Sequence, residues 1–190
     1  MVGSLYATAM DQSTAHSYAW SREVLNKTDK ICEGTPNREH FEDSIKHKDF
    51  MIFYGHGRED RLIGQDGDNL LDEQNLSYLS NKWCYWVACL AGKKLGPEAI
   101  KQGVKTVFCW DEIFVFSIDE DEEIFKEIAN FVILSMLDGL SMGESFKKLK
   151  EYARKIEKKL RRRGKHTKAD MVRWNVDHIS LLGDEEVNIS

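Results

Sequence analysis

The chain has 190 residues, of which 42% are apolar and 31% charged, with two prolines and a net charge of −5. This length and composition predict one globular domain over residues 1–190 and argue against long disordered regions. The acidic balance gives no general attraction to nucleic acid, which is therefore not an expected partner. No apolar run reaches the roughly 18 residues that a membrane helix needs, so we expect no membrane association.

The amino terminus and the cysteines indicate a reducing compartment. The first residues, MVGSLYATAMDQ, lack the basic and apolar regions of a signal peptide. The four cysteines do not have the spacing of a disulfide framework, and three of them lie in or beside apolar stretches. No CxxC or HxxxH pair is present, so no zinc site is expected. We therefore expect a cytoplasmic protein.

Strands and helices are expected to alternate along the chain. The first half of the chain predicts a strand over 5–10, a helix over 13–26 with Ser13 or Thr14 as its cap, a short helix over 37–46, a buried strand over 50–54, a hairpin over 62–71 and a short helix near 71–80. The second half predicts a strand over 83–90, a helix over 94–102 and a strand over 104–110. Amphipathic helices over 122–137 and 142–160 and a last strand over 178–184 complete the prediction. Most of these strands are apolar throughout, which is typical of strands covered on both faces. The alternation predicts a three-layer α/β/α fold with a mainly parallel sheet.

Two reactive side chains follow two of these buried strands. His56 comes after residues 50–54, between Gly55 and Gly57, and Cys89 lies at the tip of the apolar run over 83–90. In open α/β sheets, functional groups gather beyond the carboxyl ends of the strands. If the two strands are neighbours, an imidazole and a thiol face one crevice, as a cysteine nucleophile and its base require.

Each of these residues also has an ordinary structural interpretation. A cysteine at the end of an apolar strand is most often a core residue, and a histidine after a strand is most often a turn residue. The pair favours catalysis, because both follow strands and each precedes a small-residue turn. The backbone N–H groups of Gly57 and Cys89 are then candidates to stabilise an oxyanion.

Several segments together resemble the caspase-like cysteine peptidases, the clan that includes caspases, gingipains, clostripain and the CHAT domains. The segments that carry the resemblance, between residues 50 and 184, are FMIFYGHG, CYWVACLAG, LGPEAIKQGVKTVFCWDE, ILSMLDGLSMGESFKKLKEYA and HISLLGD. The resemblance implies a caspase-like fold. It also implies a cysteine endopeptidase that acts on a protein or peptide and needs no cofactor. It makes His56 the general base or acid, Cys89 the nucleophile and Gly57 an oxyanion donor.

The chain departs from the clan in two places. Members that prefer basic residues often carry an acid two positions before the cysteine, where this chain has Val87, and the glutamine-containing motif of caspases is absent. Some CHAT-type domains lack activity. The alternative function is therefore a catalytically silent interaction or signalling module, and either function suits an activating or regulatory protein partner.

The substrate preference is predicted from the residues after the strand over 104–110. The resemblance implies that Asp111 selects a basic residue before the cleaved bond and that Trp110 forms the pocket wall, with Glu112 as the second choice of acid. The structural alternative is that Asp111 only begins the next loop or caps a helix.

Two charged segments have both structural and functional interpretations. The acidic run SIDEDEE, residues 117–123, suits the amino terminus of a helix, with a calcium site as the alternative. Residues 147–168 contain twelve Lys and Arg. This segment is predicted to be the solvated face and basic end of a long helix, and a patch for an acidic partner or nucleic acid is the alternative.

Overall fold

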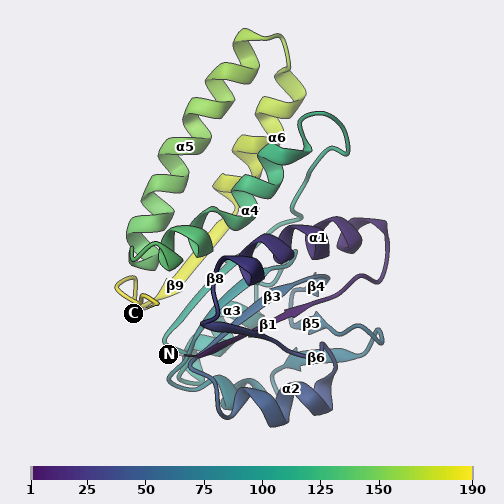
Figure 1. The fold of residues 1–190 in the computed structure, drawn as a ribbon, viewed down its shortest axis with the longest axis vertical. Helices are drawn as coiled ribbons and strands as arrows, with labels where there is room; N and C mark the ends of the chain where they lie inside the picture. Colours follow the sequence, from purple (N-terminus) through teal and green to yellow (C-terminus); the bar gives the residue numbers. More distant parts are fainter. Residues whose placement is uncertain (1, 190) are drawn as a thin grey trace.

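The computed structural model describes residues 2–189 and is built around a six-stranded sheet (Figure 1). The strand order is β2-β1-β3-β7-β8-β9, with β9 antiparallel to β8 and every other neighbouring pair parallel. The strands are β1 (Gly3–Ala7), β2 (Ile31–Glu33), β3 (Phe50–Tyr54), β7 (Trp83–Val87), β8 (Thr106–Trp110) and β9 (Ile179–Gly183). The predicted mainly parallel sheet is confirmed.

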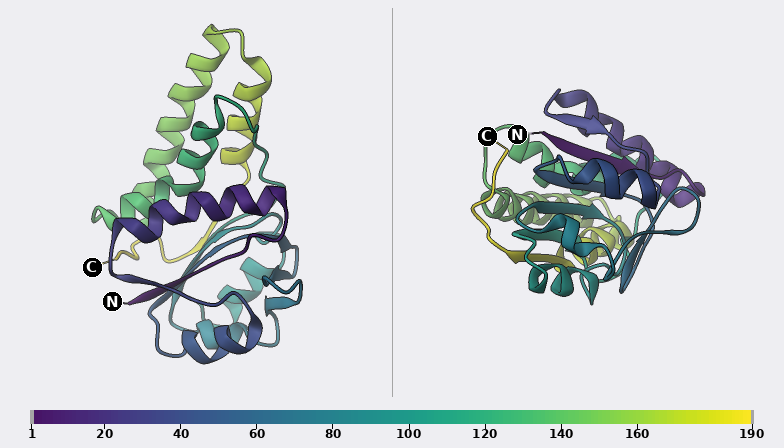
Figure 2. Two further views of the ribbon diagram at one scale, coloured as in Figure 1. Left: turned by 45° about the vertical axis from the view of Figure 1, so that its right-hand side comes forward. Right: turned by 90° about the horizontal axis from the view of Figure 1, so that it is seen from below.

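Helices cover both faces of this sheet (Figures 1 and 2). One face carries α1 (Gln12–Lys27), α4 (Glu122–Leu137), α5 (Met142–Arg162) and α6 (His166–Asp177), and the other carries α2 (Arg38–Ile45), the 3-10 helix η1 (Leu76–Leu79) and α3 (Leu95–Lys101). Each face has its own apolar core, and successive residues of the central strands alternate between the two cores. Every residue of β1, β3, β7 and β8 is buried, which explains their uninterrupted apolar runs and confirms the three-layer fold.

A second, small antiparallel sheet follows β3 directly. It consists of β4 (Gly57–Arg58), β5 (Arg61–Ile63) and β6 (Asn69–Asp72). The hairpin predicted over 62–71 is the β5–β6 pair, with its register shifted between Leu62 and Ile63. The two-residue β4 and the three-residue β2 were not predicted, because such short strands carry too little periodicity to recognise.

The beginning of α1 differs from the prediction. Neither Ser13 nor Thr14 is the cap, because Asp11 takes that position with extended backbone geometry. The Asp11 carboxylate accepts a hydrogen bond from the Thr14 N–H at 3.1 Å, and the Thr14 hydroxyl accepts one from the Asp11 N–H at 3.0 Å. This reciprocal capping satisfies two backbone donors at once, and it places a carboxylate at the end of β1.

The helices α5 and α6 form a hairpin that extends beyond the sheet (Figures 1 and 2). No helix was predicted for α6, whose buried face is narrow and includes Ala169, Val172 and Val176. Packing of α6 along α5 supplies the stabilisation that its own sequence pattern lacks. Within residues 2–189, no helix is both long enough and apolar enough to cross a bilayer.

One buried amide joins the sheet to the helices above it. The Tyr54 hydroxyl at the end of β3 donates to Asn130 Oδ1 at 2.8 Å, and Asn130 Nδ2 donates to the Trp20 carbonyl at 2.9 Å and to the Glu23 carboxylate at 3.1 Å. Asn130 is fully buried on α4, and Trp20 and Glu23 lie on α1. The network therefore holds the end of β3 against both helices.

Replacing Asn130 tests this network. We expect Asn130→Leu to lower the free energy of unfolding in urea by about 2–4 kcal/mol, because the Tyr54 hydroxyl and the Trp20 carbonyl lose their partner inside the core. Tyr54→Phe removes a single hydrogen bond and should cost about 1 kcal/mol. An Asn130→Leu protein as stable as the wild type would show that the network does not hold β3.

Candidate active site

The pairing of β3 with β7 brings the two predicted site residues together. Tyr54 is the register partner of Val87, and the Gly55 N–H continues the ladder to the Val87 carbonyl at 3.1 Å. His56 and Cys89 each lie two residues beyond this last register pair. Both line one cavity of about 370 Å³ at the carboxyl edge of the sheet. The expectation that the two strands are neighbours is confirmed.

His56 has a carboxylate partner that was not identified from the sequence. Its Nε2 lies 2.5 Å from Asp11 Oδ2, and its carbonyl accepts a hydrogen bond from the Ile63 N–H at 3.0 Å. The hydrogen bond from His56, together with those from Ser13 and Thr14, holds the pKa of Asp11 well below its usual value, so this carboxyl stays ionised. Asp11 thus fixes the ring through Nε2 and leaves Nδ1 as the other nitrogen for chemistry.

Asp11 was missed because the contact spans 45 positions in the chain. The available signal was local: Asp11 and Thr14 have the spacing of a reciprocal helix cap. That pattern predicts where α1 begins, but it does not reveal which side chain occupies the second oxygen of the carboxylate.

The glycines around His56 allow close approach of neighbouring backbone. A Cβ atom on Gly57 would lie 2.5 Å from the Cys89 carbonyl oxygen, and one on Gly55 would lie 2.2 Å from the Thr8 hydroxyl. The space they leave is thus occupied by the protein itself. The His56 carbonyl accepts a hydrogen bond from β5. Successive residues of an antiparallel strand direct their backbone groups alternately toward and away from the partner strand, so the Gly57 N–H points away from β5.

Cys89 is half-buried and holds its thiol against the loop that follows β8. The Phe114 N–H donates to Cys89 Sγ at 3.4 Å. Burial raises the pKa of the Cys89 thiol, and the hydrogen bond from Phe114 offsets part of that rise. Within residues 2–189, no hydrogen bond joins Cys89 to His56.

The turn after Cys89 has an unusual backbone. Leu90 has a φ of 64°, a left-handed conformation that non-glycine residues rarely adopt. Two hydrogen bonds hold the turn against the end of β8, from the Leu90 N–H to the Glu112 carbonyl and from the Gly92 N–H to the Trp110 carbonyl. The Cys89 N–H donates to no backbone carbonyl among residues 2–189. Strained turns of this kind are frequent at functional sites.

The cavity is lined by Ser13, Thr14, Ser17 and Trp20 from α1 and by apolar side chains from the loop after β8. The principal apolar ones are Trp20, Ile113, Phe114 and Phe116. The rings of Trp20 and Phe116 meet edge to face, 5.1 Å apart. No carboxylate lines this cavity in the described residues.

Helix α6 holds the cavity loop in place. The Asn175 side chain accepts a hydrogen bond from the Val115 N–H at 2.8 Å and donates to the Val115 carbonyl at 2.7 Å. Trp174 Nε1 donates to the Ile113 carbonyl at 2.9 Å. The unpredicted helix therefore positions residues that line the site.

The predicted substrate-selecting residues lie outside this cavity. Trp110 is 0% exposed, and its indole N–H donates to the Asn175 carbonyl, so it does not line this cavity. Asp111 bonds to His178 Nδ1 at 2.9 Å and to the Ser180 hydroxyl at 3.3 Å. Glu112 pairs with Lys93 at 2.6 Å.

The acidic run before α4 forms ion pairs with α6. Asp121 pairs with Lys165 at 2.6 Å and also with Lys168, which reaches Asp119 at 2.8 Å. Among residues 2–189, no cluster of His, Cys, Asp and Glu is suited to a metal ion. The acidic run thus joins the α5–α6 hairpin to the loop before α4. Its last acids, Glu122 and Glu123, occupy the first turn of α4 as predicted.

Comparisons with known proteins identify the fold. No protein-family profile matches the sequence, and no curated protein matches it. Among solved structures, it is similar to the Arg-specific cysteine proteinase gingipain R, with a TM-score of 0.59 and 13% identity over 98% of this chain. It is also similar to the complex of Porphyromonas gingivalis RgpB pro- and mature domains, with a TM-score of 0.62 and 13% identity over 99% of this chain.

The chain has a caspase-like fold. It spans about half of the structures that it matches, 47% and 48% of their lengths. At this identity the similarity concerns the fold alone.

The state of the Cys89 thiol predicts its reactivity. Because its pKa is raised, little thiolate is present at neutral pH, and alkylation by iodoacetamide should accelerate about tenfold per pH unit up to at least pH 9. Exposed Cys32 should react faster at neutral pH, whereas buried Cys84 and Cys109 should not react in the folded protein. Peptide mapping by mass spectrometry measures each rate. A Cys89 rate that is already maximal near neutral pH would instead show a preformed thiolate–imidazolium pair.

Proposed function

We propose that the protein is a cysteine peptidase in which Cys89 is the nucleophile and His56 the general base and acid. The observation that carries this proposal is the β3–β7 register, which places the two side chains at equivalent positions beside one cavity. Asp11 supplies the orienting group that a histidine in this role requires. The caspase-like fold supports the proposal, since the matched structures are cysteine proteinases.

The first half of the reaction forms an acyl-enzyme. His56 removes the thiol proton as Cys89 Sγ attacks the scissile carbonyl carbon, and the carbonyl oxygen becomes an oxyanion. The N–H groups of Cys89 and Gly57 are the proposed donors to that oxyanion, since neither is used by a neighbouring strand. His56 then returns the proton to the leaving amine as the C–N bond breaks.

The second half restores the enzyme. His56 takes a proton from water, the hydroxide attacks the thioester carbonyl, and the carboxylic product leaves as Cys89 recovers its proton. Asp11 stabilises the imidazolium that forms in both halves, because its carboxylate remains ionised and bonded to Nε2. These steps involve only the side chains of this chain, the substrate and water.

Substitutions at Asp11 and Cys89 test the proposed machinery. Cys89→Ala should remove hydrolysis of fluorogenic peptides and unfolded casein. Asp11→Asn should lower kcat by about a hundredfold with little change in KM, because the Asp11 carboxylate orients His56 and does not touch the substrate. Asparagine is as good a helix cap as aspartate, so circular dichroism should show an unchanged helix content.

The exchange Asn37→Asp, at the cap of α2, provides the matched control and should leave kcat unchanged. Hydrolysis that persists in Cys89→Ala would rule out this mechanism. If the folded wild type cleaves no peptide and binds no substrate-like aldehyde, the silent interaction module becomes the better assignment.

The lining of the cavity supports an apolar substrate side chain. Asp111 was predicted to select basic residues, but its carboxylate is held by His178 and Ser180 outside the cavity. The residue before the cleaved bond would instead contact Trp20, Phe114 and Phe116. Desolvating a guanidinium against these rings, without a carboxylate partner, is unfavourable.

Three fluorogenic peptides with Phe, Arg or Asp before the cleaved bond distinguish these cases. We expect the Phe peptide to have a kcat/KM about tenfold or more above the others. Ile113→Asp adds a carboxylate to the exposed part of the lining and should shift the ratio toward Arg. A wild-type preference for Arg that is lost in Asp111→Asn would restore Asp111 as the selecting residue.

A further inference from the structure

Positive charge is concentrated on α5, which contributes no residue to the cavity. Residues 147–168 contain twelve of the 27 Lys and Arg residues but two of the 32 acidic residues, a net charge of +10. The remaining 15 basic and 30 acidic residues carry −15. The molecule thus consists of an acidic body and a strongly basic helical hairpin.

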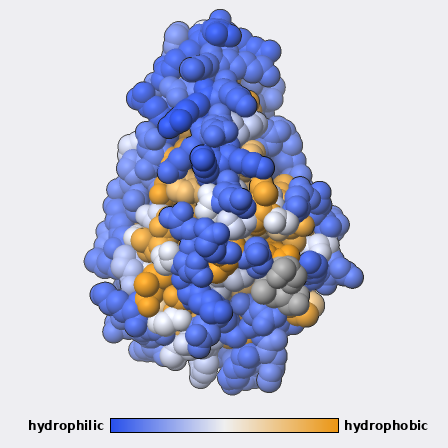
Figure 3. All heavy atoms as spheres, turned by 90° about the vertical axis from the view of Figure 1, so that its left-hand side faces the viewer, coloured by the Kyte–Doolittle hydropathy of each residue, from blue (hydrophilic) through white to orange (hydrophobic). Residues whose placement is uncertain are grey.

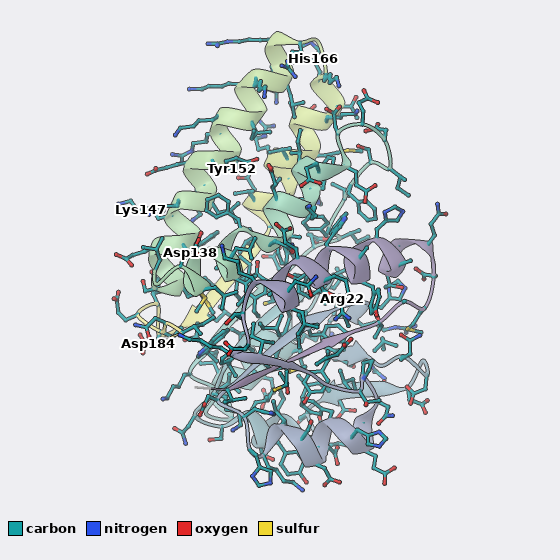
Figure 4. All side chains as sticks on the ribbon, in the orientation of Figure 1. Arg22, Asp138, Lys147, Tyr152, His166 and Asp184 are labelled. Carbon is teal, nitrogen blue, oxygen red and sulfur yellow. The ribbon has the colours of Figure 1, made fainter. Side chains whose placement is uncertain are left out.

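The exposed Lys and Arg residues from Lys147 to Arg163 form what we call the α5 cationic face. Nine cations belong to it, and Glu151 is the single exposed acid among them in the described part of the chain. Lys147 points away from the body in Figure 4, and the upper part of the molecule is almost uniformly hydrophilic in Figure 3. Within residues 2–189, none of the nine cations pairs with a carboxylate.

Helix stability does not account for this arrangement. Lys150, Arg154, Lys158 and Arg162 follow one another at intervals of four residues, and each such pair of like charges destabilises the helix. The helix dipole favours cations only in the last turn, at Lys159, Arg161 and Arg162. Most of the charge therefore lies where folding gains nothing from it.

The composition of the face indicates the class of partner. It contains no exposed apolar residue, so it lacks the anchors of a protein interface and of a membrane-surface helix. Its cations extend over about 24 Å of helix axis, a length that suits a polyanion with closely spaced phosphates. We propose that the α5 cationic face binds the phosphodiester backbone of nucleic acid without reading its sequence.

This proposal reverses the expectation drawn from net charge. The total of −5 predicts no attraction to nucleic acid, but the charge is divided between two parts of the molecule. The negative body repels a polyanion and the hairpin attracts it, so the molecule approaches with the hairpin first. The proposal is independent of the peptidase chemistry.

The test is the salt dependence of binding to a labelled duplex of about two helical turns, as DNA and as RNA, measured by fluorescence anisotropy with the full chain. The α5 variant combines Lys147→Gln, Arg154→Gln, Lys158→Gln and Arg162→Gln. The body control combines Lys27→Gln, Lys46→Gln, Lys101→Gln and Lys105→Gln, all exposed and outside α5. Both variants change the net charge equally.

For the wild type, we expect the logarithm of the association constant to fall linearly with the logarithm of the salt concentration. The α5 variant should lose about tenfold or more in affinity at about 50 mM salt, with a slope smaller by about 3 to 4. The body control should stay close to the wild type. Glutamine preserves the helix, so circular dichroism of the α5 variant should match the wild type.

Three outcomes would overturn the proposal: no binding by the wild type at about 50 mM salt, equal losses in both variants, or stronger binding to polyglutamate or phosphatidylserine vesicles than to either duplex. The last would assign the face to an acidic protein or a membrane surface. Tighter binding of DNA or of RNA supports the proposal and identifies the nucleic acid.

Discussion

The parallel pairing of β3 with β7 is the constraint on which the candidate site depends. A ladder that pairs Tyr54 with Val87 leaves His56 and Cys89 at equal distances beyond the sheet. A shift of one residue would point one side chain into the opposite layer, because side chains alternate between the two faces of a strand. The apolar cores on both faces specify this register, so the energy that folds the sheet also positions the two reactive groups.

Asp11 connects this register to the helices above it. One oxygen of its carboxylate caps α1 and the other holds His56, so the residue that begins the helix also orients the imidazole. Further along α1, Trp20 lines the cavity, and its carbonyl accepts the hydrogen bond from buried Asn130. Helix α1 is therefore part of the site at its first turn and part of the core at its middle.

The loop between β8 and α4 has a similar double role. Phe114 contacts the Cys89 thiol through its backbone N–H, and Asp121 forms ion pairs with α6. Asn175 on α6 holds the same loop by its backbone. One segment thus contacts both the candidate site and the basic hairpin. The hairpin combines a structural contribution to the site with an exposed charged face that the site does not use.

The sequence by itself determined the layers, the buried strands and the order of His56 and Cys89, because local apolar periodicity and glycine turns encode these features. It did not determine α6, whose narrow apolar face is stabilised by packing along α5. The contact of Asp11 with His56, the burial of Trp110 and the engagement of Asp111 by His178 were decided by the tertiary structure alone. Each of them joins residues distant in the chain, and no local pattern specifies which side chain meets a charged or aromatic group across the fold.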